Sequence, residues 1–213
     1  TIWIALLGSG YHLYDKRLPW LEAFSQNCCS LLHGQEAISA FFAQARTDEV
    51  AVNPWWPRAS CLSRASFLLN ESLHLDLEGY LAFEARSAAH QAWRDPDFVQ
   101  WIERFPSALS QVLQLDGLHA LLAQFQSETA KRLPDFQKDL EKAASVISRF
   151  DGSEHARRLA FMPNLLQAPQ LTDYVQQETR LIVIANQPDL ASMVHEWLHP
   201  IGKEQLSKLD PAE

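Results

Sequence analysis

From Pro19 to Phe150 the sequence repeats one pattern, in which apolar residues recur three or four positions apart and proline or glycine interrupts the run. This spacing is typical of amphipathic helices that each bury one face. Proline suits the first turn of a helix, and glycine suits the position just after its end. Asp95-Pro96-Asp97 is a helix-start signal for Phe98 to Phe105. We expect seven helices: Pro19 to Gly34, Gln35 to Arg46, Glu78 to Trp93, Phe98 to Phe105, Pro106 to Leu115, Leu118 to Arg132, and Asp135 to Phe150.

The first two of these helices have well-defined apolar faces, which we expect to form part of the core. The residues at helical spacing are Leu21, Phe24, Cys28, Leu31 and Leu32 on the first, and Ile38, Phe41, Phe42 and Ala45 on the second.

Four stretches are candidate strands instead. Ile2 to Leu7 is a short apolar run ending in Gly8-Ser9-Gly10, which indicates a buried strand and a turn. Leu73, Leu75 and Leu77 alternate with polar residues. Arg180 to Asn186 is β-branched and continuous, so it is the strongest strand prediction, with Leu171 to Gln176 as a candidate antiparallel neighbour.

The chain has no repeat at a fixed period and no long low-complexity linker. Residues 1–165 are expected to form a mainly helical region. Residues 166–213 are expected to supply a strand and a last helix from Leu190 to about His199, packed with the first part as one compact domain. The predicted fold class is α+β, mainly α-helical, with a small sheet before the last helix near the C-terminus.

Composition excludes some classes of partner. The formal net charge of −8 disfavours nucleic acid, because a phosphate backbone requires a basic face. Ile2 to Leu7 is far too short to cross a bilayer, so no membrane span is expected. Cys28, Cys29 and Cys61 lack the spacing of a secreted disulfide framework, which favours reduced thiols and a cytoplasmic location.

The candidate metal-binding and acid–base residues lie in the segment His195-Glu196-Trp197-Leu198-His199. The two histidines are four positions apart, about one helical turn, so both imidazoles project from the same face. Two ring nitrogens in this arrangement can bind one Zn²⁺. Glu196 lies about 100° around the helix, where a carboxylate can take a proton from a water molecule and pass it to a leaving amine.

These five residues match the H-E-x-x-H signature, and the segment resembles the zincin metallopeptidases from about residue 180 to 205. In that superfamily a sheet precedes the active-site helix and its edge strand binds the substrate backbone. The resemblance implies a zincin-like fold, zinc ligands His195 and His199, general base Glu196, and a peptide or protein substrate lying along Ile182 to Ala185.

The resemblance leaves the third zinc ligand open. Pro200 directly follows the second histidine and must kink or end the helix there. Gly202 matches the turn of the metzincin branch, but the position of its third histidine holds Gln205. The other large branch uses a glutamate at least some 18 residues further on, whereas the acidic residues here are Glu204, Asp210 and Glu213.

Three explanations compete for that ligand: a C-terminal region beyond Glu213 supplies it, it comes from elsewhere in the fold, or the site is degenerate. We favour the first explanation. His155 is a candidate for an upstream ligand, and Tyr174 for stabilising an oxyanion; for His155 the commoner outcome is a solvent-facing side chain. The other histidines are expected at the surface or satisfied: His12, His33, His74, His90 and His119.

The sequence therefore predicts a zinc-dependent peptidase. The alternative is a non-catalytic helical interaction protein with a degenerate zincin-like site, which Pro200 and the unassigned third ligand favour.

Overall fold

A computed structural model describes residues 1–11, 18–46, 58–87, 95–151, 159–166, 172–176, 179–184 and 194 of the 213-residue chain. The chain divides into two compact units, Thr1–Phe125 and Gln126–Glu213. We describe each unit by itself, and the sequence-based division at residue 165 stays a prediction.

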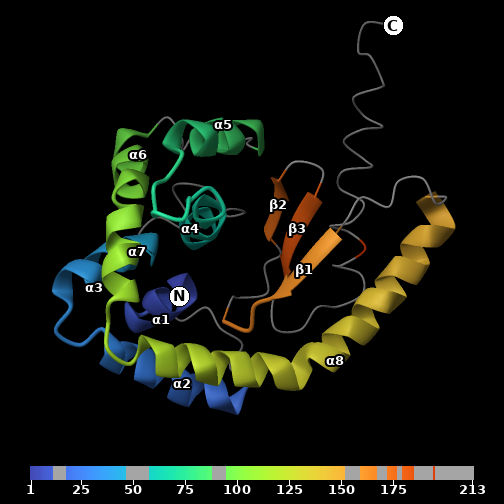
Figure 1. Cartoon of the computed structure of the whole chain (residues 1–213), viewed down its shortest axis with the longest axis horizontal. Helices are drawn as coiled ribbons and strands as arrows, with labels where there is room; N and C mark the ends of the chain where they lie inside the picture. Colours follow the sequence, from blue (N-terminus) through green and yellow to red (C-terminus); the bar gives the residue numbers. More distant parts are fainter. Residues whose placement is uncertain are drawn as a thin grey trace, which may run out of the picture. The chain divides into compact units, whose positions relative to one another are not determined.

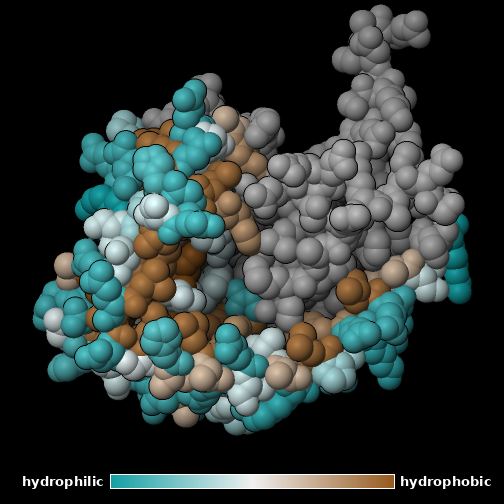
Figure 2. Space-filling model, viewed as in Figure 1, coloured by the Kyte–Doolittle hydropathy of each residue, from teal (hydrophilic) through white to brown (hydrophobic). Residues whose placement is uncertain are grey.

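Unit 1 is built from helices (Figure 1). They are α1 (Ile2–Gly8), α2 (Pro19–Leu31), α3 (Glu36–Ala43), the short 3₁₀ helix η1 (Gln44–Arg46), α4 (Arg58–Ser66), α5 (Leu77–Ser87), α6 (Pro96–Glu103), α7 (Phe105–Leu113) and the start of α8 (Leu118–Asp151). On the face that Figure 2 shows, hydrophilic residues line most of the outer edge of this unit, and apolar residues gather further in.

The predicted apolar faces of α2 and α3 are confirmed. All but one of the nine residues are buried, and Leu31 is half-buried. Asp95 is also confirmed as a helix start, because its carboxylate accepts a hydrogen bond from the Asp97 N–H at 3.0 Å at the N-terminus of α6. Local spacing and capping therefore predicted these helices well.

The strand predicted at Ile2 to Leu7 is wrong, since these residues form helix α1. A short continuous apolar run has no period that distinguishes a strand from a buried helix. Here the four residues Ile4–Leu7 are at most 1 % exposed. Gly8 ends the helix where a Cβ would come within 2.6 Å of the Cys28 carbonyl oxygen, so a glycine lets α1 approach α2 closely.

The strand predicted around Leu73, Leu75 and Leu77 is also wrong. Leu75 makes only an isolated bridge with Leu69, and Leu77 begins α5. In the loop between Leu69 and Leu75, the side-chain oxygen of Asn70 accepts hydrogen bonds from the N–H groups of Ser72 and His74, both at 2.9 Å. This asparagine satisfies the loop backbone locally and competes with extended pairing.

Helix α8 runs unbroken from Leu118 to Asp151 where the sequence predicts two helices separated near Pro134. Pro134 lies inside the helix and is exposed. Proline removes one backbone hydrogen bond, but on an exposed face water can satisfy the carbonyl oxygen that is left without a donor. Helix α4 was not predicted at all, because apart from Leu62 its buried side chains are small or polar and give no apolar period.

Unit 2 contains a sheet described by its backbone, with strand order β1-β3-β2 (Figure 1). Strands β1 (Leu159–Pro163) and β3 (Thr179–Ile184) are parallel, and β2 (Thr172–Gln176) is antiparallel to β3. Tyr174 pairs with Leu181 in that register.

The predicted fold class, α+β and zincin-like, is wrong. Of the residues whose backbone and side chains are both described, 77 % are helical and none lies in a strand. The physical reason is that two of the predicted strands are a helix and a turn, so the described core is helical. No zincin-like arrangement of sheet and active-site helix is found among the described residues.

Within those same ranges, no helix combines the length and the apolar character that crossing a bilayer requires.

Candidate functional site

The H-E-x-x-H residues His195, Glu196 and His199 lie outside the described residues. The residue directly before them, Val194, is helical and half-buried. The other candidates that fall outside the described ranges are His12, His90, His155, Pro200, Gly202, Glu204, Gln205, Asp210 and Glu213. Tyr174 is placed by its backbone alone, on β2.

The histidines that the structure does describe do not gather into a site. His33, His74 and His119 are all exposed, as predicted for surface residues. Across the described ranges, no three side chains of the His, Cys, Asp and Glu types lie together so that they could hold a metal ion. A metal centre built from unit 1 alone therefore has no support in the described residues.

The three cysteines are free thiols, and two of them are buried. Burial raises the pKa of the Cys28 thiol to about 12 and that of the Cys61 thiol to about 11. A thiol with such a pKa stays protonated at neutral pH and is a poor nucleophile. Cys28 and Cys61 therefore behave as packing residues in the folded state.

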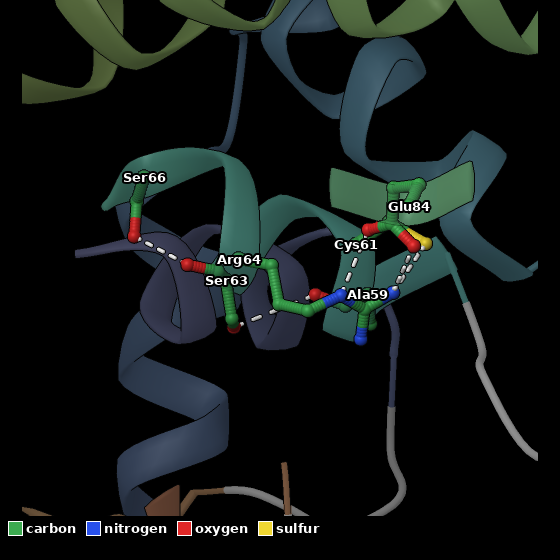
Figure 3. Close-up of polar contacts among 6 residues, drawn as sticks. All are labelled: Ala59, Cys61, Ser63, Arg64, Ser66 and Glu84. Atoms are coloured by element: carbon green, nitrogen blue, oxygen red, sulfur yellow. Dashed lines mark hydrogen bonds and ion pairs between the residues drawn. The ribbon is translucent and has the colours of Figure 1, made fainter. Parts of the chain in front are cut away.

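A group of buried polar side chains lies where α4 meets α5 (Figure 3). The Arg64 guanidinium donates from Nε to Glu84 Oε1 at 2.8 Å and from Nη2 to Glu84 Oε2 at 3.1 Å. The same Nη2 donates to Cys61 Sγ at 3.2 Å. The pair is well shielded from water, because the Arg64 side chain is 1 % exposed and that of Glu84 is 13 % exposed.

Glu84 compensates the buried charge of Arg64 in this polar cluster of Cys61, Arg64, Tyr80 and Glu84. Burial alone would lower the pKa of Arg64, but the electrostatic contacts of the guanidinium outweigh burial and raise it, so the guanidinium stays charged. Tyr80 is fully buried, and burial together with Cys61 and Glu84 raises its pKa well above the ordinary value. The cluster holds a compensated ion pair and two neutral groups, an arrangement suited to fastening helices.

A second buried cation, Arg58, is held by aromatic rings. Its guanidinium carbon lies 5.3 Å from the ring centroid of Trp101 and 5.7 Å from that of Phe98, both on α6. The indole N–H of Trp101 donates to the Phe41 carbonyl oxygen at 3.1 Å. These contacts join α4, α6 and α3.

Sequence reasoning did not identify Arg58, Arg64 or Glu84. Arg64 and Glu84 are 20 positions apart, and no local spacing signals that they meet. Their roles come from tertiary packing, which only the structure reveals.

Comparison with protein-family models, with curated proteins and with solved structures found no match to this chain.

Proposed function

We propose that this protein is a zinc-dependent peptidase in which His195 and His199 bind Zn²⁺ and Glu196 is the general base. The observation that carries the proposal is the order and spacing of His195-Glu196-Trp197-Leu198-His199. Neutral imidazole nitrogens are common zinc ligands, so the donor set suits this metal.

When bound, zinc lowers the pKa of water toward 7 and so supplies hydroxide near neutral pH. Glu196 stands next to the first histidine in sequence and accepts the proton that the attacking water loses. The same carboxyl group then delivers that proton to the amine that leaves when the peptide bond breaks. A peptide or protein is therefore the proposed substrate. The proposed compartment is the cytoplasm, on the basis of the cysteine pattern.

The arrangement of unit 1 is consistent with locating the chemistry in the H-E-x-x-H segment. Arg58 and Arg64 are committed to packing contacts, and the Cys28 and Cys61 thiols are buried. Such groups hold the folded state together.

Replacing Glu196 with glutamine tests the proposal most sharply, because glutamine keeps the size of the side chain and cannot act as a base. We expect Glu196→Gln to retain zinc and to lose at least about 100-fold in the hydrolysis of a mixture of fluorescence-quenched peptides. Glu141→Gln is the matched control, since Glu141 is exposed on α8. Hydrolysis that survives Glu196→Gln at the wild-type rate would rule out this mechanism.

A second candidate function is a non-catalytic helical interaction protein, which Pro200 favours because it disrupts the helix directly after His199. This alternative predicts that the wild-type protein, supplied with zinc, neither retains the metal after dialysis nor cleaves any peptide in the mixture.

A further inference from the structure

Fewer of the described side chains of helix α5 are buried than in several other helices of unit 1. Among residues 77–84, whose side chains are described, Tyr80 alone is buried. Other helices of unit 1 have more buried residues: α3 and α6 have three each, and α7 has four. A helix that buries little apolar surface has a low free energy of local unfolding.

A polar pairing joins α5 to α4. Glu84 follows Tyr80 by one helical turn and so lies on the same face of α5. Both of its carboxylate oxygens accept hydrogen bonds from Arg64 on α4. This two-point pairing fixes the position of α5 more strictly than a single hydrogen bond would.

The thiol of Cys61 lies within this contact (Figure 3). Its sulfur accepts a hydrogen bond from Arg64, and both Tyr80 and Glu84 are close enough to influence its ionisation. Cys61 is 3 % exposed. Two of the side chains that influence it, Tyr80 and Glu84, belong to α5.

We propose that α5 is a lid over Cys61, held shut by the Arg64–Glu84 ion pair, which opens while the rest of unit 1 stays folded. Opening removes Tyr80 and Glu84 from the thiol and admits water. Arg64 remains one turn away on α4, where its positive charge favours the thiolate. The lid therefore separates an unreactive closed state from an open state with a reactive thiol.

Alkylation of the full chain with iodoacetamide, followed cysteine by cysteine with mass spectrometry, tests the lid. Cys29 is exposed and reacts first, whereas buried Cys28 on α2 reports opening of the α1–α2 region. In the wild-type protein we expect Cys61 to react at least about tenfold faster than Cys28, because α5 opens more often than unit 1 unfolds.

Two substitutions separate local opening from global unfolding. Glu84→Gln removes the charge that Arg64 pairs with and is expected to speed alkylation of Cys61 about tenfold. Glu78→Gln, an exposed position on the same helix, is the matched control and leaves that rate unchanged. Phe24→Leu weakens the α1–α2 core, so it speeds alkylation of Cys28 and leaves that of Cys61 unchanged.

Two results would overturn the lid. In the first, Cys61 accelerates together with Cys28 in Phe24→Leu, which means that the thiol is exposed only by global unfolding. In the second, Glu84→Gln leaves the Cys61 rate at the wild-type value. If Glu84→Gln does not fold, amide hydrogen exchange of the wild-type protein decides: α5 must exchange faster than α2 and α7, and equal protection refutes the proposal.

Discussion

Two contacts between helices in unit 1 are stabilised by different kinds of interaction. Helices α1 and α2 are in contact, and both contribute completely buried apolar side chains, among them Leu6, Leu21 and Phe24. Helices α4 and α5 meet through the Arg64–Glu84 ion pair and the buried ring of Tyr80. The first contact depends on removing apolar surface from water, and the second on matching one charge to another.

The difference teaches how each contact should respond to substitution. Burying a large apolar side chain contributes about 1.5–3 kcal/mol, and deleting it also leaves a cavity. A buried ion pair contributes little net stability, because desolvation offsets most of the attraction, but removing one partner leaves the other charge uncompensated. The substitutions below test this contrast from the largest expected effect to the smallest.

Phe24→Ala should cause the largest loss, about 3–5 kcal/mol in the free energy of unfolding, because the ring is 0 % exposed and its removal leaves a cavity. Urea unfolding followed by circular dichroism measures the loss. Phe24→Leu should retain most of the stability. A loss below about 1 kcal/mol in Phe24→Ala would show that the α1–α2 core collapses around the gap.

Gly8→Ala should cost about 1–3 kcal/mol, because the new Cβ would lie 2.6 Å from the Cys28 carbonyl oxygen and 2.8 Å from a Leu32 methyl carbon. The oxygen belongs to the backbone of α2, so the two helices must move apart. Gly34→Ala is the comparison, since its Cβ meets nothing within 4 Å and its cost comes from a φ of 77° alone. Equal thermal unfolding temperatures for Gly8→Ala and the wild-type protein would contradict the close approach.

The Arg64–Glu84 pair should show coupling in a double-mutant cycle. Arg64→Met and Glu84→Gln should each destabilise unit 1, and the double variant should lose about 1–2 kcal/mol less than the two losses combined. This figure allows for the partial exposure of Glu84, at 13 % of its side chain. Additive losses in urea unfolding would mean that the two side chains do not stabilise each other.

The ion pairs of Glu128 on α8 should have the smallest effect. Hydrogen bonding from Lys131 is the main cause that lowers the pKa of Glu128, and Arg132 adds to it. Lys131→Ala should cost no more than about 0.5 kcal/mol, because the Lys131 side chain is 63 % exposed and water screens the pair. Lys138→Ala, another exposed position on α8, is the control.

The sign of the pH dependence follows from the lowered pKa of Glu128. The contribution of its ion pairs is fully present above the ordinary value of 4.5 and is lost as the pH falls through the lower folded-state pKa. We therefore expect the difference in unfolding temperature between the wild-type protein and Lys131→Ala to disappear as the pH falls from 7 to 3. A difference that grows in acid would contradict a stabilising ion pair between Lys131 and Glu128.

The contrast between these contacts also explains what the sequence could predict. The faces of α2 and α3 follow from residues three and four apart, and Asp95 marks a helix start through its own side chain. Ile2 to Leu7 gave the wrong element because an unbroken apolar run has no period. The exposed Pro134 did not end its helix, because on that face solvent can replace the lost hydrogen bond.

The same distinction between local spacing and tertiary packing applies to the functional candidates. The sequence predicts His195, Glu196 and His199 as a site because the two histidines are one helical turn apart, which is a local pattern. The meeting of Arg64 with Glu84 could not be predicted, since it depends on how α4 and α5 pack and no local pattern encodes it.

Zinc binding by His195 and His199 is the claim on which the proposed function rests, and elemental analysis of the purified full chain tests it directly. After supply of zinc and dialysis, we predict about one zinc ion per wild-type chain. Either His195→Ala or His199→Ala should lose the metal, and His119→Ala, a change at an exposed histidine, should keep it. A metal-free wild-type protein, or equal zinc content in all four proteins, would contradict the claim.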